Sequence, residues 1–151
     1  MSPDTFEKGA PHARSWHAGV LPSLLVIYGA ASLVHFIHNA EFLAAYPNLP
    51  SSWLREDVYL AWVAMTAVGV VGWLLMSRGL VLAGLLILVV YAGLGLDSLG
   101  HYALAPLSAH TFAMNSTILA EVTAAGLVLV EVARQIARRW RDLIASKLQR
   151  M

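Results

Sequence analysis

The sequence predicts an all-α integral membrane protein: a four-helix bundle whose helices run up-down-up-down across a bilayer. Three observations predict this fold. Hydrophobic residues make up 58% of the 151 residues and charged residues only 13%, which is about half the charged share of soluble domains. Four long apolar stretches follow one another with short connections. Nine of the ten lysines and arginines fall on the same side of the bundle that these stretches would form.

The four predicted spans cover residues 22–46, 57–76, 79–104 and 108–133. Each is close to the ~20 residues that are needed to cross the hydrocarbon layer. Pro22 suits the first turn of a helix, where its missing N–H costs nothing. Glu56 and Asp57 place negative charge at the start of the second helix, and Ser108 is the expected N-cap of the fourth. A soluble bundle would need a charged face on every helix, and residues 80–96 contain no charge.

Small residues within the spans predict close contacts between helices. Gly69 and Gly72 lie in the second span, and Gly93 and Gly100 lie in the third. Glycines allow two helix backbones to approach closely in a membrane. We therefore expect these four positions to be packing points.

The distribution of basic residues predicts the orientation of the chain. Only Arg55 lies between the first and second spans, whereas the other nine basic residues lie in the termini or in the turn at Arg78. Positive charge is retained on the cytoplasmic side. We therefore expect a multi-pass protein of the plasma (inner) membrane, N-in and C-in. It would consist of a cytoplasmic segment 1–21, a transmembrane domain 22–133 and a basic tail 134–151.

The tail is predicted to be a cytoplasmic amphipathic C-terminal helix. Its apolar residues recur at helical spacing, with arginines and lysines between them: Ile136, Trp140, Leu143, Ile144 and Leu148. This pattern is typical of a helix that lies on anionic lipid. It is equally typical of a solvated extension of the fourth helix.

Polar residues gather at one depth of the predicted bundle. The motif HFIHN carries His35, His38 and Asn39 near the outer end of the first span, and DSLGH carries Asp97 and His101 in the third. The fourth span adds three further polar residues at its outer half: His110, Asn115 and Glu121. Ionisable groups within a membrane normally face the bundle interior and pair with one another. We therefore expect a polar cluster that opens to the outer face; whether Asn39 and Glu41 belong to it is left open.

The spacing of these residues predicts a metal site. His35 and His38 are three residues apart, and Asp97 and His101 are four apart, so each pair shares a helix face. The chain has no cysteine, and nitrogen and oxygen ligands without thiolate suit a divalent Fe, Zn, Mn or Cu ion. The expected metal ligands are His35, His38, Asp97, His101 and His110, and the candidate catalytic residues are Glu121 and Asn115.

The predicted function is that of a small membrane metal-binding protein, and a site of this kind serves a metal-dependent oxidoreductase or hydrolase. Three alternatives remain open. Two histidines on facing helices would also ligate a b-type haem. A metal-free acid–base site would act on a lipid-like substrate. A purely structural network would join the helices. The expected partners are membrane lipid, a lipophilic small-molecule substrate and further copies of the chain in a homo-oligomer; no feature indicates nucleic acid.

Overall fold

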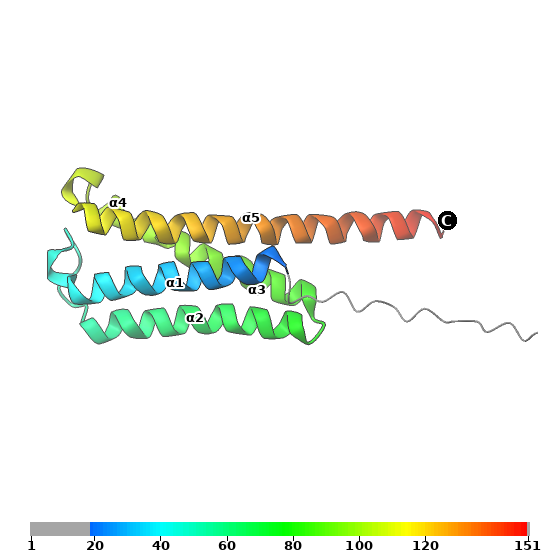
Figure 1. Cartoon of the computed structure of the whole chain (residues 1–151), viewed down its shortest axis with the longest axis horizontal. Helices are drawn as coiled ribbons and strands as arrows, with labels where there is room; N and C mark the ends of the chain where they lie inside the picture. Colours follow the sequence, from blue (N-terminus) through cyan, green and yellow to red (C-terminus); the bar gives the residue numbers. More distant parts are fainter. Residues whose placement is uncertain (1–18, 151) are drawn as a thin grey trace, which may run out of the picture.

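The structure, a computed structural model, describes residues 19–150 of the chain. Four long helices lie side by side (Figure 1): α1 (Val20–Glu41), α2 (Arg55–Ser77), α3 (Val81–Leu96) and α5 (Phe112–Leu148). Each contacts the next in chain order, and α1 also contacts α5, so the four helices form a closed ring. All four are long and apolar enough to cross a membrane when α3 is counted through Leu104. The prediction of an all-α protein with four membrane spans is confirmed.

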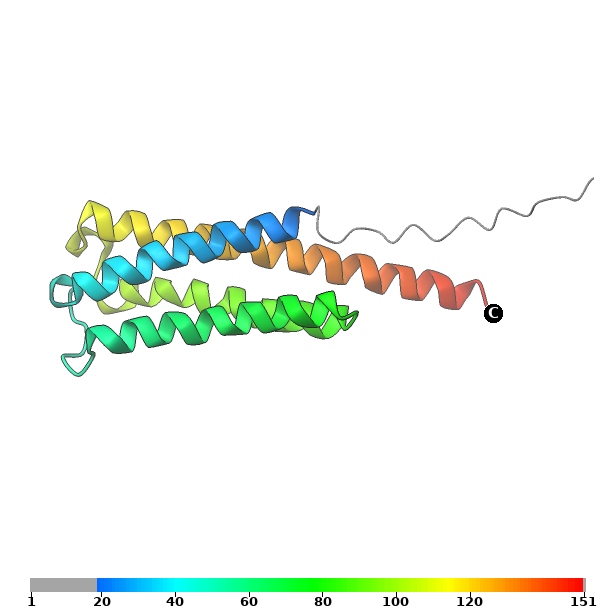
Figure 2. The ribbon, with the colours of Figure 1, turned by 60° about the horizontal axis from the view of Figure 1, so that its bottom comes forward.

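Short helical turns lie at the end of the bundle opposite to the C-terminus (Figure 2), here called the loop end. They are η1 (Leu43–Ala45), η2 (Asp97–Leu99), α4 (Gly100–Leu104) and η3 (Leu107–Ala109). The predicted first span was too long, because α1 ends at Glu41 and the chain then turns. The predicted third span is also not one regular helix, since a 3₁₀ turn separates α3 from α4.

The starts of two helices show which polar residues satisfy free backbone N–H groups. Asp57 accepts a hydrogen bond from the Leu54 N–H at 3.0 Å, as expected for an acidic residue in the first turn of α2. The predicted N-cap of the fourth helix was wrong by three residues. Thr111, not Ser108, is its N-cap, and the Thr111 hydroxyl accepts from the Met114 N–H at 3.2 Å. Ser108 instead lies in the 3₁₀ turn η3.

The outward faces of the helices are apolar. Val26 is 73% exposed and Leu60 is 65% exposed, and similar side chains cover the outside of all four helices. Exposed apolar surface of this extent would cause aggregation in water, whereas it is the expected surface of a protein in lipid.

The bundle core is organised around two tyrosines and the glycines beside them. The Tyr28 hydroxyl donates to the backbone carbonyl of Tyr91 at 3.0 Å, and both rings are buried. Tyr91 packs on Gly69, where an added Cβ would lie 2.7 Å from the ring. Gly72 is equally close to α3. These two packing predictions are confirmed.

The two glycines predicted in the third span do not serve this purpose. A Cβ added at Gly93 or Gly100 would meet no atom within 4 Å. The close contacts of α3 are made by Gly84 and Gly95, which face α2 and α1. The rotation of α3 about its own axis therefore decides which of its glycines face a neighbouring helix. The composition of the helix does not show that rotation.

The C-terminal tail continues α5 without a break and projects beyond the other helices (Figure 1). Its apolar side chains are exposed, including Trp140 and Leu148. The tail is therefore a continuation of α5 and not a separate helix. Residues 1–18, which include most of the predicted cytoplasmic segment 1–21, lie outside the described residues.

Candidate functional site

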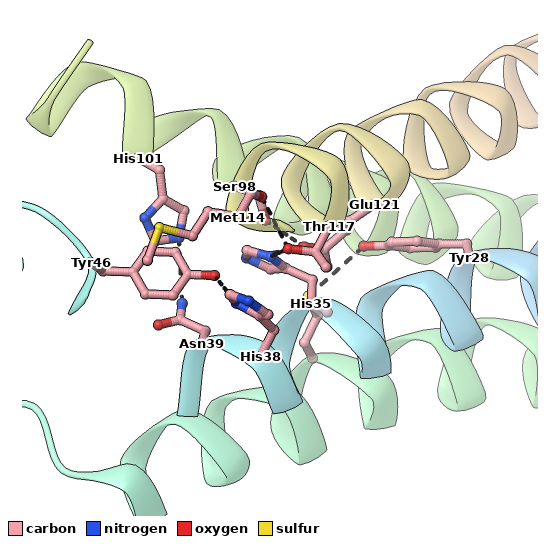
Figure 3. Close-up of polar contacts among 11 residues, drawn as sticks. Tyr28, His35, His38, Asn39, Tyr46, Ser98, His101, Met114, Thr117 and Glu121 are labelled. Carbon is pink, nitrogen blue, oxygen red and sulfur yellow. Dashed lines mark hydrogen bonds and ion pairs between the residues drawn. The ribbon is translucent and has the colours of Figure 1, made fainter. Parts of the chain in front are cut away.

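The predicted polar cluster forms inside the loop end of the bundle (Figure 3). Helix α1 contributes His35, His38 and Asn39, and α5 contributes Thr117 and Glu121. The turns that follow α1 and α3 add three residues: Tyr46, Ser98 and His101. Elements far apart in the sequence thus bring their polar side chains to one place.

A histidine–glutamate pair lies at the bottom of the cluster. His35 is 2% exposed and Glu121 is fully buried. His35 Nε2 lies 3.7 Å from Glu121 Oε2, and the Ser98 hydroxyl donates to the same oxygen at 2.6 Å. The other oxygen, Glu121 Oε1, is buried without a hydrogen-bond partner among the described residues. Because a buried carboxyl group with a free oxygen is costly, this pair is a functional candidate rather than a simple structural link.

The neighbours of the pair fix which His35 nitrogen carries a proton. The Thr117 hydroxyl donates to the Met114 carbonyl at 3.0 Å, so its oxygen is available as an acceptor. His35 Nδ1 lies 3.3 Å from that oxygen and therefore carries the hydrogen. Nε2 then faces Glu121 with its lone pair unless a further proton is bound. With this tautomer, the pair can carry a proton either on the carboxyl group or on His35 Nε2.

A second group of side chains lies above the pair, toward the loop end. The His101 ring contacts the His35 ring, with centroids 5.4 Å apart, and lies 6.3 Å from the His110 ring. His110 Nδ1 donates to the Pro106 carbonyl at 3.1 Å, which leaves its buried Nε2 without a partner among the described residues. Three of the predicted histidines, His35, His101 and His110, therefore form a row.

His38 joins the cluster through a tyrosine that sequence analysis did not place there. His38 Nδ1 lies 2.9 Å from the Tyr46 hydroxyl, and Tyr46 is buried against the His101 ring. Burial raises the pKa of Tyr46 to about 12. The phenol is therefore protonated at physiological pH, and its hydrogen bond with His38 ties the segment after η1 to α1.

We expect alkaline unfolding to depend on Tyr46. Its pKa is raised from 10 to about 12 in the folded chain, so the folded state holds this proton more tightly than the unfolded state. That contribution is fully present below pH 10 and is lost as the pH rises to about 12, on the order of 2–3 kcal/mol. Tyr46→Phe should flatten the fall in stability over this range, measured as unfolding midpoint against pH. An unchanged slope in the variant would show that another group is responsible.

A cavity of about 470 Å³ lies beside the pair, between α1, α2 and α3. His35, Asn39, Asp97, Ser98 and His101 contribute its polar wall. The remaining lining is mainly apolar and aromatic, and includes Phe36, Trp53, Met65 and Leu94. His35 and Ser98 both touch Glu121, so these two side chains connect the cavity with the buried carboxyl group. A cavity of this size and lining suits a lipophilic small molecule.

Two predicted site residues lie away from the buried pair. Asp97 is exposed on the cavity wall and makes no ion pair among the described residues, and it is its neighbour Ser98 that reaches Glu121. Asn115 lies in the first turn of α5 and forms hydrogen bonds with the loop before it. It accepts from the Tyr102 hydroxyl at 2.9 Å and donates to the carbonyls of Leu107 and His110.

Glu41 and the predicted metal set also have defined places. Glu41 accepts hydrogen bonds from Arg55 and Tyr59, and so joins the end of α1 to the start of α2.

Within residues 19–150, no three histidine, aspartate or glutamate side chains lie close enough together to hold a metal ion. A ready-made metal centre is thus not part of this arrangement of side chains.

Ser98 and Thr117, which hold the buried pair, were not among the predicted site residues. A signal for Thr117 exists in the sequence, because it lies four residues before Glu121 on the same helix face. Ser98 gives no such signal, since its direction depends on the 3₁₀ turn.

No family model, curated protein or solved structure matches this chain.

Proposed function

We propose that this chain is an integral membrane acid–base enzyme that transfers a proton to or from a lipophilic small molecule held in the cavity. The observation that supports this proposal is the buried His35–Glu121 pair, which reaches the cavity through His35 and Ser98. General acid–base catalysis needs a proton-carrying group within reach of the substrate and a partner that replenishes the proton. The apolar remainder of the lining selects a lipophilic substrate.

Each residue of the pair has a separate role in this proposal. His35 lines the cavity and is the catalytic residue that exchanges the proton. Glu121 is covered by His35 and Ser98, and stores the proton behind them. Thr117 and Ser98 are positioning residues, because one fixes the Nδ1 hydrogen of His35 and the other holds the carboxyl group.

Isotope labelling tests the proposal with a mixture of lipids in place of a single chosen substrate. Purified protein in lipid nanodiscs would be incubated with a lipid extract in water enriched in deuterium and ¹⁸O. Proton transfer to carbon introduces deuterium into a product, and hydrolysis introduces ¹⁸O. We expect mass spectrometry to find a labelled lipophilic species with the native protein and not with His35→Leu. A complete absence of protein-dependent label would overturn the proposal.

A metal site is the second candidate, and the row of three histidines favours it. His110 Nδ1 is held by a backbone carbonyl while its buried Nε2 is unpartnered among the described residues, which is the usual state of a metal-binding imidazole. Rotation of His101 between His35 and His110 would be needed to bring three nitrogens onto one ion. Elemental analysis of the purified protein tests it: stoichiometric Fe, Zn, Mn or Cu, lost in His110→Leu, would replace the metal-free proposal, and metal below stoichiometry would exclude this candidate.

We also propose that both termini are cytoplasmic and that the cavity faces the outer side of the plasma (inner) membrane. The described basic residues other than Arg55 lie in the α2–α3 turn and the projecting part of α5, at the end opposite to the cavity (Figure 1). Such an asymmetry keeps this end in the cytoplasm.

A reporter protein at the C-terminus tests this orientation. We expect a C-terminal fusion to show cytoplasmic activity, and a fusion inserted after Ser51, between α1 and α2, to show activity on the outer side. The opposite pair of results would place the cavity on the cytoplasmic side and would reverse the proposed orientation.

A further inference from the structure

The cavity wall carries hydrogen-bond acceptors that no group in the described chain satisfies. Asp97 is exposed on this wall and has no ion-pair partner among the described residues. Asn39 directs its Nδ2 toward His101 Nε2 at 3.4 Å, and its Oδ1 points the other way (Figure 3) and is buried without a partner. Two acceptors, one from α1 and one from η2, thus line the same cavity. Their complement is a ligand that donates hydrogen bonds.

The charged residues of the cavity lining restrict the chemical class of the ligand further. Asp97 is the only Asp or Glu, and no Lys or Arg is present, among the described residues that line the cavity. A cationic head group would be attracted by this carboxylate, while an anionic group would find no counter-charge. A phospholipid is disfavoured for the same reason, because its phosphate would lack a basic partner.

We propose that the cavity selects a long-chain primary amine, with Asp97 and the Asn39 side-chain carbonyl receiving its ammonium N–H groups. The apolar lining, which includes Phe36, Trp53 and Leu94, takes the hydrocarbon chain. A quaternary ammonium group has the same charge but no N–H to donate, so it satisfies the carboxylate only in part. Asp97 is thus a specificity-determining residue. This inference rests on the proposed function, because it assumes that the cavity is the substrate site.

Photoaffinity labelling tests the proposal. The probe is a twelve-carbon primary amine with a diazirine near the end of its chain, applied to the full chain in nanodiscs of zwitterionic lipid. We expect crosslinks to map to the apolar cavity residues. Unlabelled dodecylamine should compete at a concentration about tenfold lower than dodecanol or dodecyltrimethylammonium, as expected for one added charge-assisted hydrogen bond. Dodecyl sulfate should compete least.

Asp97→Asn and Glu56→Gln form a matched pair for this experiment. Both remove one negative charge at the loop end, but Glu56 does not line the cavity. Asp97→Asn should abolish the preference for the primary amine, and Glu56→Gln should retain it. Equal competition by amine, quaternary amine and alcohol at the cavity would overturn the amine proposal and leave the proposed function standing. Crosslinks that avoid the cavity with every probe, including an alcohol diazirine, would overturn both.

Discussion

Gly84→Ala is expected to destabilise the bundle by about 3 kcal/mol, the upper end of the usual cost of overpacking. An added Cβ would lie 2.6 Å from the carbonyl oxygen of Gly72 and 2.9 Å from the backbone nitrogen of Met76. Both are backbone atoms of α2, so no side chain can move aside to relieve the clash. The helices α2 and α3 would have to separate, and the unfolding midpoint in mild detergent should fall markedly.

Gly93→Ala is the matched control, because it makes the same change on the same helix. A Cβ at Gly93 meets nothing within 4 Å, and alanine favours the helix over glycine by about 1 kcal/mol. We expect an unchanged or slightly raised midpoint. Equal destabilisation by the two variants would show that backbone flexibility of α3, and not the contact with α2, determines stability.

The spans could be predicted because their signal is local. Each needs about 20 consecutive apolar residues, and a single uninterrupted stretch supplies them. The ends of the helices were less predictable. Thr111 displaces Ser108 as the N-cap because η3 takes up residues that would otherwise have extended the helix. The choice of a cap depends on how the chain folds before the helix, and this is not a local property.

The candidate site was predictable as a cluster but not as a set of contacts. Costly polar residues on three helices had to meet inside the bundle, and His35 and Glu121 do so. Asp97 was expected to share the helix face of His101 in a regular α-helix. Asp97 and His101 do line the same cavity, but the 3₁₀ turn at Asp97–Leu99 changes the rotation per residue, and the residue that reaches Glu121 is Ser98. Such a change of helix type leaves no clear pattern in the sequence.

Removal of His35 and Glu121 together is expected to cost less stability than the sum of the two single losses. His35→Leu removes the imidazole from Glu121, whose carboxyl group then faces only the hydroxyls of Ser98 and Ser32, and Glu121→Leu removes the carboxyl group that His35 Nε2 faces. Each single variant therefore leaves a buried polar group without this partner, which lowers the free energy of unfolding by about 1–3 kcal/mol. The double variant removes both polar groups, so neither is left without a partner. We therefore expect a coupling free energy of about 1–2 kcal/mol between the two substitutions.

His38→Leu provides the control for this cycle. His38 lies one turn from His35 on α1, but its partner is Tyr46. Its loss should add to that of Glu121→Leu within about 0.5 kcal/mol, as for sites that do not interact. If the His35–Glu121 cycle proved equally additive, the two side chains would not share a proton, and the proposed centre would be wrong.

The same variants should show a stronger non-additivity in the labelling reaction. A positioned acid–base group contributes about 10²–10⁴-fold to a rate, so His35→Leu alone should remove most of the incorporated label. Glu121→Leu should do the same, because His35 then lacks the group that replenishes its proton. When two residues act as one catalytic unit, removing the second after the first causes no further loss of rate. The double variant should therefore be no slower than either single variant. A purely structural pair would change stability in this pattern and leave the rate, measured per folded molecule, almost unaffected; this difference separates a catalytic pair from a structural one.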